Sequence, residues 1–483
     1  MSIANSIQKK MTHNTGNVPT NTFSNQNFRE NHAALHFIAI GGSAMHNLAL
    51  ALHAKGYQVT GSDDAIFEPS KSRLEKKGLL PIAMGWFPEK INSHLEAVIL
   101  GMHARADNPE LLKAQELGVK IYSYPEYLYE QSKHKTRVVI GGSHGKTTIT
   151  SMILHVMHYH NIDVDYMVGA QLDGFDTMVH LTESNDFMVL EGDEYLSSPI
   201  DRRPKFHLYK PNIALVSGIA WDHINVFPTY ENYFEQFEIF VSMITNGGIL
   251  IYNEDDIEVK KMAENALNPI RKLPYHTPKY SVQNGVTLLE TPEGNMPIGV
   301  FGAHNLNNLA GAKWVCQNMG VDEDAFYEAI ASFKGASKRL EKIAENSTKV
   351  AFKDFAHSPS KVSATTKAVK EQYPNRKLIA CLELHTYSSL NANFLKEYEG
   401  ALDSADLAVV FYSPDAVKIK QLDNVTYNQI SEAFKRQNLL IFTDPAEFRK
   451  FLFTTNLENT ALLLMSSGNY GGLNFDDLKA IIS

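Results

Sequence analysis

The chain has 483 residues, which is enough for about three domains of ordinary size. Its composition, 44% hydrophobic and 20% charged, is that of a globular protein with several hydrophobic cores. A net charge of −9 argues against nucleic acid or an anionic membrane surface as a general partner, although it is compatible with a local basic pocket for phosphate groups.

The cysteine content and the N-terminal segment indicate the cellular compartment in which the protein is expected. The two cysteines, Cys316 and Cys381, are far apart and lack metal-ligand spacing. They exclude a disulfide scaffold and a cysteine-based zinc site and favour a reducing compartment, so we expect a cytoplasmic protein. No apolar run approaches the roughly 18–20 residues that span a bilayer, so no membrane insertion is expected. Residues 1–33 are rich in Asn, Thr, Ser and Gln, lack the apolar core of a secretion signal and are predicted to form a disordered tail.

The first folded segment, residues 34–134, alternates strand-like and helical patterns. An apolar run enters the glycine turn Gly41-Gly42-Ser43, and a later strand ends at Gly61-Ser62-Asp63. The predicted strands are residues 35–40, 58–60, 97–100 and 119–122, with a helix over 45–55. This alternation favours a parallel α/β domain. The polar residues 131–135 are interpreted as a linker to the next domain.

Residues 135–333 are predicted to form a second α/β domain. It begins with a strand over 137–140, a glycine loop and a helix from Lys146. Two further buried strands are predicted at 187–190 and 213–216, each followed by acidic residues or histidine. The turn-rich stretch 268–305 predicts short antiparallel strands, and a helix is expected near 305–319.

Residues 334–483 predict a third α/β domain. The expected strands are residues 350–352, 377–381, 407–411, 439–442 and 460–465, and a helix is expected over 360–373. The last strand ends in the glycine-containing segment 466–472. Three α/β domains in succession are therefore the predicted architecture.

The most informative motif is Gly141-Gly142-Ser143-His144-Gly145-Lys146-Thr147-Thr148, which joins a predicted strand to a helix. It is a shortened form of the usual phosphate-binding loop, because Ile140 stands where that loop has its first glycine. Backbone N–H groups of such a loop and the positive end of the helix bind phosphate oxygens. Lys146 would reach the β- and γ-phosphates, and the Thr147 hydroxyl would bind Mg²⁺. The simpler interpretation is a glycine turn that only starts a helix.

Acidic and histidine side chains follow the next two predicted strands of the same domain. Glu191-Gly192-Asp193-Glu194 follows one strand, and Asp222-His223 follows the other. Because the carboxyl ends of parallel strands meet at one edge of a sheet, we expect these groups beside the phosphate loop. Three carboxylates so close together repel unless a cation balances them. A solvated acidic turn is the alternative, but the combination predicts a Mg-nucleotide site.

The glycine turn of the first domain is less specific. Gly41-Gly42-Ser43 with Asp63 about 20 residues later is similar to a dinucleotide-binding fingerprint. Ala39 and Ala44, however, stand where that fingerprint has glycines. We favour a nucleotide-linked substrate here, with nicotinamide binding and a plain tight turn as the alternatives.

Taken together, these motifs resemble those of the Mur ligase family, the ATP-dependent amide-forming ligases of peptidoglycan assembly. The resemblance covers essentially the whole chain after the tail. Further elements that carry it, in family order, are Asn253 with Asp255-Asp256, residues 302–308 (GAHNLNN), Arg339-Leu340-Glu341 and residues 354–359 (DFAHSP). The resemblance implies a Rossmann-like UDP-sugar domain, a central phosphate-loop ATPase domain with a mostly parallel sheet, and a Rossmann-like domain for the incoming amine.

The resemblance also implies roles for individual residues, with ATP and Mg²⁺ as cofactors. The implied ATP-binding residues are Gly142, Ser143, His144, Gly145, Lys146, Thr147, Thr148, Asn305, Arg339 and Asp354. The implied UDP-sugar-binding residues are Gly41, Gly42, Ser43, Asp63 and His103. Lys146, Glu191, His223 and His357 are the implied catalytic residues, and Thr147, Glu191 and His223 the implied metal ligands. Glu238 falls about where some family members carry a carbamylated lysine, and we hypothesise that its carboxylate takes over that role.

Two branches of the family fit, and they differ in the amine. The Gly41-Gly42 turn and residues 385–388 (HTYS) resemble the branch that joins UDP-N-acetylmuramate to L-alanine. Asp193-Glu194-Tyr195, residues 201–206 (DRRPKF) and residues 105–109 (RADNP) resemble the recycling branch, which uses the tripeptide L-alanyl-γ-D-glutamyl-meso-diaminopimelate. We favour the tripeptide branch. Arg202, Arg203 and Lys205 would line its cleft, or would form a solvated basic turn.

The implied reaction forms an acyl phosphate from the muramyl carboxylate and ATP, and an amine then displaces phosphate. His223, His357 or a carboxylate would serve as the base. The expected partners are the small-molecule substrates alone, with neither nucleic acid nor membrane, and the expected state is a monomer or weak homodimer. An ATPase switch acting on a protein partner and a non-catalytic UDP-sugar sensor are the alternatives of another class.

Overall fold

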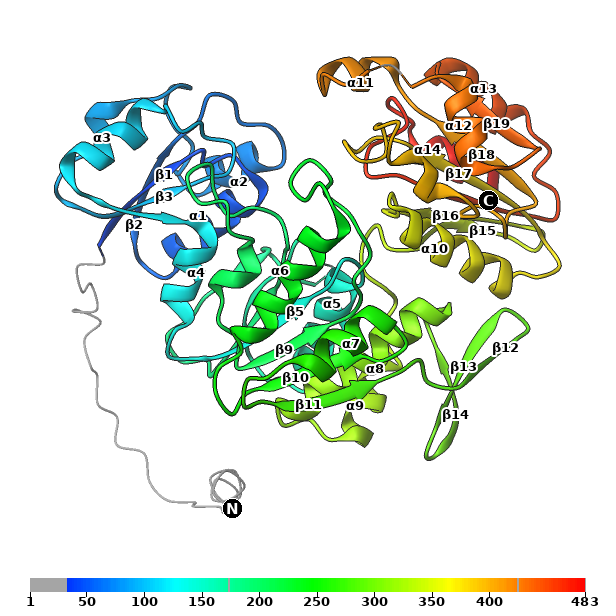
Figure 1. The fold of residues 1–483 in the computed structure, drawn as a ribbon, viewed down its shortest axis with the longest axis horizontal. Coiled ribbons are helices and arrows are strands. Elements are labelled where there is room, and N and C mark those ends of the chain that lie inside the picture. Colours follow the sequence, from blue (N-terminus) through cyan, green and yellow to red (C-terminus); the bar gives the residue numbers. More distant parts are fainter. Residues whose placement is uncertain (1–32, 173, 424, 483) are drawn as a thin grey trace, which may run out of the picture.

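The computed structural model describes residues 33–482 except 173 and 424. Its three large sheets come from three successive stretches of chain, called here the N-terminal, central and C-terminal units (Figure 1). The α/β class predicted from the sequence is confirmed. No helix within the described part of the chain is long and apolar enough to cross a membrane. The predicted disordered tail, apart from Ala33, lies outside the described residues.

The N-terminal unit is a four-stranded parallel sheet with strand order β2-β1-β3-β4. Its strands are β1 (Ala34–Ile38), β2 (Gln58–Ser62), β3 (Leu95–Leu100) and β4 (Lys120–Ser123). Its helices are α1 (Ser43–Ala54), α2 (Ser70–Lys76), α3 (Pro109–Leu117) and α4 (Tyr124–Ser132), with a short 3₁₀ turn at Pro88–Lys90. Leu35 and Phe37 pack on one side and Ile38 on the other. The two central strands, β1 and β3, are mostly buried and apolar, whereas β2 and β4 at the edges carry exposed polar residues.

The predicted linker over residues 131–135 is wrong for its first two residues. Gln131 and Ser132 are the last turn of α4, which Ser123 begins with a reciprocal capping box to Glu126. The Ser132 hydroxyl donates to the Leu128 carbonyl at 2.7 Å, within the helix. The side chain of Ser132 is buried and hydrogen-bonds within the helix, so it does not interrupt α4, and only residues 133–135 join α4 to the next strand.

The central unit is a seven-stranded sheet with strand order β11-β10-β9-β5-β8-β6-β7, parallel except for β7. Its strands are β5 (Thr136–Gly141), β6 (Asp165–Met167), β7 (Val179–His180), β8 (Phe187–Glu191), β9 (Ile213–Val216), β10 (Ile249–Asn253) and β11 (Arg271–Tyr275). Its helices are α5 (Lys146–Tyr159), α6 (Tyr230–Ser242), α7 (Ile257–Asn265), α8 (Ala303–Asn318) and α9 (Glu323–Ile330), with a 3₁₀ turn at Lys205–Leu208. Because β5 lies between β8 and β9, the three motif-bearing strand ends are neighbours.

A small antiparallel sheet extends from the central unit toward the C-terminal unit (Figure 1). It consists of β12 (Tyr280–Gln283), β13 (Val286–Thr291) and β14 (Gly294–Ile298), which confirms the antiparallel strands predicted for this stretch, whereas β11 is a parallel edge strand of the main sheet. The sheet contacts the last turn of α10 (Pro359–Gln372), where Thr287 donates to Gln372 at 3.0 Å and Gln372 donates to the Gly285 carbonyl at 2.6 Å.

The C-terminal unit is a six-stranded sheet with strand order β15-β16-β20-β17-β18-β19, parallel except for β15. Its strands are β15 (Glu341–Glu345), β16 (Lys349–Asp354), β17 (Lys377–Glu383), β18 (Leu407–Phe411), β19 (Leu439–Phe442) and β20 (Thr460–Met465). Besides α10 it has the helices α11 (Pro414–Ile419), α12 (Tyr427–Phe434), α13 (Pro445–Thr454) and α14 (Phe475–Ile482), with a 3₁₀ turn at Leu395–Tyr398. The bounds of β18, β19 and β20 coincide with the predicted ones.

Candidate active site

The glycine loop between β5 and α5 is shaped to approach its neighbours closely. Gly142 and Gly145 have positive φ values of 133° and 80°. A β-carbon on Gly142 would lie 2.1 Å from the Ser217 hydroxyl, and one on Gly145 would lie 2.3 Å from the Asn308 side-chain oxygen. Only glycine fits these positions. Because no side chain caps the first turn of α5, its N–H groups remain available for an anion.

Lys146, the first residue of α5, is held by two acceptors. Its ammonium donates to the Gly142 carbonyl and to a Glu194 carboxylate oxygen, each at 2.6 Å. Glu194 is 1% exposed and also accepts from the Tyr233 hydroxyl at 3.0 Å. Burial alone would lower the pKa of Lys146, but the charges of Glu194 and Asp193 outweigh it and raise that pKa above its usual value. Lys146 is therefore a fixed positive charge.

Thr147 and Glu191 form the second contact at this edge. The Thr147 hydroxyl donates to Glu191 at 2.8 Å, and the other carboxylate oxygen accepts from the Gly169 N–H at 2.7 Å. Glu191 is the last residue of β8 and lies beside the strand that feeds the glycine loop. A hydroxyl and a buried carboxylate oxygen are thus side by side at the start of α5.

The segment after β9 brings Asp222 and His223 to the same place. Asn253 donates to the Ser217 carbonyl at 2.9 Å, and Asp256 accepts from the Ile219 N–H at 2.9 Å, so these two motif residues fix the segment that leads to His223. His223 has a φ of 56°, which is uncommon for a residue other than glycine. Its Nε2 atom lies 3.7 Å from Glu194 Oε1.

Asp222 is buried and faces the C-terminal unit. Its Oδ2 atom lies 3.8 Å from Lys361 Nζ and 4.0 Å from His357 Nε2. Burial would raise the pKa of this carboxyl, but the charges of Lys361, His223 and His357 bring it down to about 2. Asp222 is therefore a carboxylate at neutral pH.

The C-terminal unit contributes a loop that precedes β15 and one that follows β16. Arg339 lies over the Phe355 ring, with 4.6 Å from its guanidinium carbon to the ring centroid, and donates to the Thr147 hydroxyl at 3.4 Å. Asp354 accepts from the N–H groups of Leu340 and Ala356 at 2.5 and 2.6 Å, so it joins the two loops. These contacts place the Arg339 guanidinium at the start of α5.

A cavity of about 270 Å³ lies between the two units. Of the residues predicted to bind ATP, all but Gly142 line it, and so do the catalytic candidates; these are Ser143, His144, Gly145, Lys146, Thr147, Thr148, Asn305, Arg339 and Asp354, with Glu191, His223 and His357. Gly142 lies just outside, where its carbonyl holds Lys146. Lys361 also lines the cavity and was not singled out in the sequence. Four further lining residues had been noted in motifs without a role: Glu194, Asp222, His304 and Asn308.

Three of the imidazoles that line this cavity have lowered pKa values. Burial, with the charges of Lys361, His304 and Lys146, lowers the pKa of His144 to about 3. Burial and the charge of Lys361 lower the pKa of His357 to about 4. His304 is also shifted downward by burial. The lysine and arginine side chains that line the cavity are Lys146, Arg339 and Lys361.

The residues predicted to bind the UDP-sugar lie elsewhere, at the carboxyl edge of the N-terminal sheet. The Gly41 N–H donates to Asp63 at 2.7 Å, which brings the first two strand ends together. Ala39, where the dinucleotide fingerprint has glycine, adopts a φ of 66°, so the turn keeps the left-handed geometry without the glycine. Ser43 begins α1, and His103 is exposed in the turn after β3.

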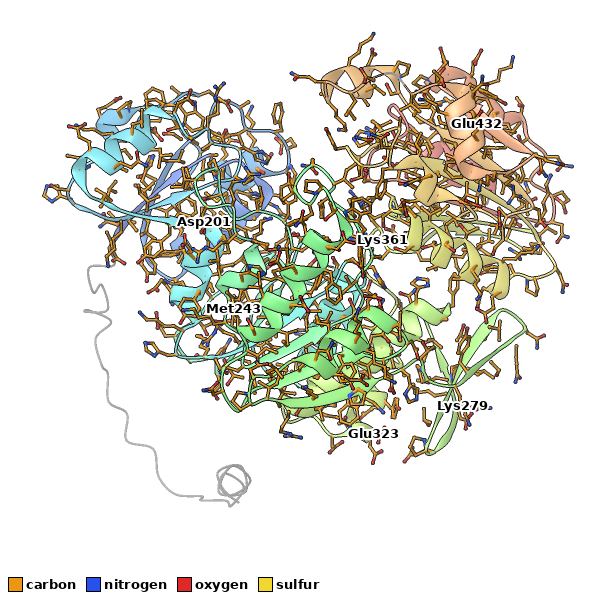
Figure 2. The ribbon with its side chains drawn as sticks, in the orientation of Figure 1. Asp201, Met243, Lys279, Glu323, Lys361 and Glu432 are labelled. Carbon is orange, nitrogen blue, oxygen red and sulfur yellow. The ribbon has the colours of Figure 1, made fainter. Side chains whose placement is uncertain are left out.

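Two other expectations are changed by the fold. Glu238 is on the exposed side of α6 and does not line the cavity, so it is not placed to replace a carbamylated lysine; the residue of that helix that faces the site is Tyr233. In the basic turn, Arg203 pairs with Asp201 at 2.6 Å and with Glu126 of α4 at 3.3 Å. Figure 2 shows Asp201 where the N-terminal and central units meet, so this turn joins two units.

The chain matches two family models. Residues 34–136 match the model described as Mur ligase family, catalytic domain, and residues 140–316 match the Mur ligase middle domain. The UDP-N-acetylmuramate–L-alanine ligase of Caldicellulosiruptor bescii is 30% identical over 390 residues, which are 77% of this chain and 82% of that protein.

Two solved structures share the fold. A UDP-N-acetylmuramate–alanine ligase from Thermotoga maritima has a TM-score of 0.67 at 20% identity, over 93% of this chain and 98% of that one. A murein peptide ligase from Psychrobacter arcticus has a TM-score of 0.63 at 22% identity, over 93% and 99%. Since the likeness in sequence extends over most of both proteins, the chain belongs to the Mur ligase family, the ATP-dependent, ADP-forming ligases of peptidoglycan synthesis.

Proposed function

We propose that this ligase joins the lactyl carboxylate of UDP-N-acetylmuramate to an amine through an acyl phosphate. The observation that carries the proposal is the junction of two units at one cavity. Lys146 and the uncapped start of α5 provide a phosphate cradle from the central unit. Arg339 and His357 enter the same cavity from the C-terminal unit, which in this family receives the amine.

The charges of the cavity suit phosphoryl transfer. The sugar carboxylate attacks the γ-phosphorus, the bond to the β–γ bridging oxygen breaks, and ADP leaves. Lys146 and the loop N–H groups hold the β- and γ-phosphates, while Arg339 offers further donors from the C-terminal unit. Enclosure between two units excludes water from the acyl phosphate, which would otherwise be hydrolysed.

We propose His357 as the base for the second step. Its Nδ1 atom lies 2.8 Å from the Phe355 carbonyl, which accepts a hydrogen bond and therefore fixes the proton on Nδ1. The Nε2 lone pair is then free, and the pKa of about 4 keeps the ring neutral at physiological pH. As the amine attacks the acyl carbon, the bond from that carbon to the phosphate oxygen breaks, and Nε2 accepts the proton that the nitrogen loses.

The oxygen ligands beside the phosphate cradle fit Mg²⁺. Thr147 and Glu191 would hold one ion, and His223, next to Glu194, would contribute to a second. Within the described residues no cluster of three or more His, Cys, Asp or Glu side chains is placed to hold a metal alone. This suits Mg²⁺, which binds through one or two protein ligands together with phosphate oxygens and water. When bound, Mg²⁺ neutralises charge on the phosphates.

The N-terminal unit is proposed to bind the UDP-sugar. Gly41, Gly42 and Ser43 form the turn that opens onto the start of α1, and Asp63 and His103 follow the neighbouring strands. A turn and helix N-terminus at the carboxyl edge of a parallel sheet suit a diphosphate. Substitution of Asp63 by Asn should then weaken UDP-N-acetylmuramate binding without changing ATP binding.

For the amine we propose L-alanine first, because the curated relatives similar over most of this chain are named as L-alanine ligases. The tripeptide, which the sequence motifs favoured, is the second candidate. A further cavity of about 390 Å³ adjoins the first and shares Ser360 with it. Trp221, Phe394 and Glu397 are among its lining residues. L-alanine is small enough to bind without entering this second cavity, whereas a peptide extending from the reacting centre would occupy it.

The test is phosphate release from ATP with Mg²⁺ and UDP-N-acetylmuramate, to which either L-alanine or the tripeptide is added. Release that requires the sugar and L-alanine would support the first candidate. Release that responds only to the tripeptide would replace it with the second. Release that no amine stimulates would contradict ligation and favour an ATPase switch.

A further inference from the structure

Lys361 is a charged residue of the cavity to which the proposed chemistry gives no task. It belongs to the first turn of α10 and lies where the C-terminal unit faces the central unit (Figure 2). Its side chain is 22% exposed and lines the same cavity as Lys146. A lysine in such a position loses hydration and side-chain freedom, so it needs a compensating partner.

The partner that the protein supplies is incomplete. Lys361 Nζ lies 3.8 Å from Asp222, which is beyond hydrogen-bond distance, whereas Lys146 Nζ lies 2.6 Å from Glu194. Across the described residues no hydrogen bond joins Lys361 to another side chain or carbonyl. Burial lowers its pKa, the charge of Asp222 opposes this, and the charges of Lys146 and Arg339 add to the lowering. The ammonium donors of Lys361 are thus available to a ligand of negative charge.

The surrounding backbone favours the same ligand. α10 is a helix of 14 residues whose cap residue, Ser358, makes no side-chain hydrogen bond to its first turn. Ser360 and Lys361 of that turn line the cavity, as do Lys146 and Thr147 of the first turn of α5. Two helix N-termini, each with a lysine, therefore face one enclosed space from different units. An anion between them meets positive charge on both sides.

We infer that Lys361 binds the phosphoryl group in transit between ATP and the sugar carboxylate, as a second lysine opposite Lys146. This rests on the proposed function and deepens it. The step needs no proton from Lys361: the γ-phosphorus loses its bridging oxygen to ADP and gains the carboxylate oxygen. Because Lys361 belongs to the C-terminal unit, phosphoryl transfer is fast only while that unit is docked against the central unit. In that arrangement the amine bound to the C-terminal unit can attack the acyl phosphate as soon as it forms.

The test follows the first half-reaction alone. Enzyme, ATP, Mg²⁺ and UDP-N-acetylmuramate are mixed without amine, and the acyl phosphate is trapped with hydroxylamine as a hydroxamate. Loss of one charge-assisted hydrogen bond to the phosphoryl group should slow hydroxamate formation by about 10- to 100-fold in Lys361→Gln. ATP affinity, measured by calorimetry, should change little, and Lys361→Arg should recover part of the rate. Lys367→Gln, an exposed lysine of the same helix, is the matched control and should behave as the wild type.

Two results would overturn the inference. One is hydroxamate formation in Lys361→Gln at the wild-type rate. The other is an Asp222→Asn variant as slow as Lys361→Gln, with a double variant no slower than either, since Lys361 would then act only by pairing with Asp222. Equal melting temperatures exclude misfolding as the cause of a slow rate. If the wild type itself forms no hydroxamate, the acyl phosphate route fails, and this inference fails with it.

Discussion

The Arg339 guanidinium donates a hydrogen bond to the Thr147 hydroxyl at 3.4 Å, and that hydroxyl donates to Glu191 at 2.8 Å. The first contact crosses from the C-terminal unit to the central unit, and the second ends at the carboxylate proposed to bind Mg²⁺. Thr147 can accept and donate at once only with its proton directed at Glu191. The contact from the C-terminal unit therefore orients the Thr147 hydroxyl toward Glu191.

Arg339→Ala should reduce kcat/KM for ATP by about 10-fold or more, because a charge-assisted contact is lost from the phosphate end of the site. Arg339→Lys keeps the charge but loses the planar group that lies over Phe355, so it should fall between Ala and wild type. Steady-state kinetics with varied ATP measures both. Arg449, an exposed arginine paired with Asp477, provides the control Arg449→Ala. Wild-type kinetics in Arg339→Lys would contradict a role for the planar group, and identical kinetics for the two Arg339 variants would contradict a contribution of the charge alone.

Lys146→Ala should abolish turnover but leave UDP-N-acetylmuramate binding measurable by calorimetry, because the sugar is proposed to bind the N-terminal unit. The change also leaves the carboxylate of Glu194, which is 1% exposed, without its ion-pair partner, and so should lower the melting temperature. Adding Glu194→Gln removes this unpaired buried charge, so the double variant should regain thermal stability while remaining inactive. Loss of sugar binding in Lys146→Ala would show that the units do not divide the substrates in this way.

The central half of this site could be predicted from the sequence because it is built from strand ends. Gly145 and His223 follow buried apolar strands and Glu191 ends one, and parallel strands place their carboxyl ends at one edge. A short continuous run of apolar residues therefore predicts both the strand and the edge of the sheet at which the next polar residues lie. The same reasoning gave the bounds of β18 and β20 without error.

The other half depends on how two units dock, and no local pattern encodes this. Arg339 and Thr147 are 192 residues apart in the chain and meet only in the docked arrangement. Lys361 stands within a helical pattern that equally predicts a solvated lysine. β15 was missed because its Glu and Lys residues mark a polar edge strand, which lacks the apolar run of a buried one. Glu238 was misplaced because spacing along α6 does not say which side of the helix faces the site.

Stability should fall as the pH decreases below about 6.5, through the half-buried imidazole of His144. The folded pKa is about 3, against 6.5 in an unfolded chain. Between these pH values the His144 imidazole is protonated in the unfolded state but not in the folded state, so protonation favours unfolding as the pH decreases. The melting temperature measured from pH 7.5 to 5 should decline less steeply in His144→Gln. A parallel decline in variant and wild type would contradict this assignment.

Filling the second cavity should separate the two candidate amines. Ser363 is exposed on α10 and lines that cavity, so the indole of Ser363→Trp would occupy part of it. If the enzyme accepts the tripeptide, its KM should rise by about 10-fold or more, because a displaced portion of the peptide loses its contacts, while kcat/KM for L-alanine should stay as in the wild type. Ser363→Ala, which removes only the hydroxyl, is the control. An equal loss of kcat/KM for both amines would mean that the tryptophan disturbs Lys361 on the same helix rather than an amine site. An unchanged KM for an accepted tripeptide would mean that the peptide does not bind in this cavity.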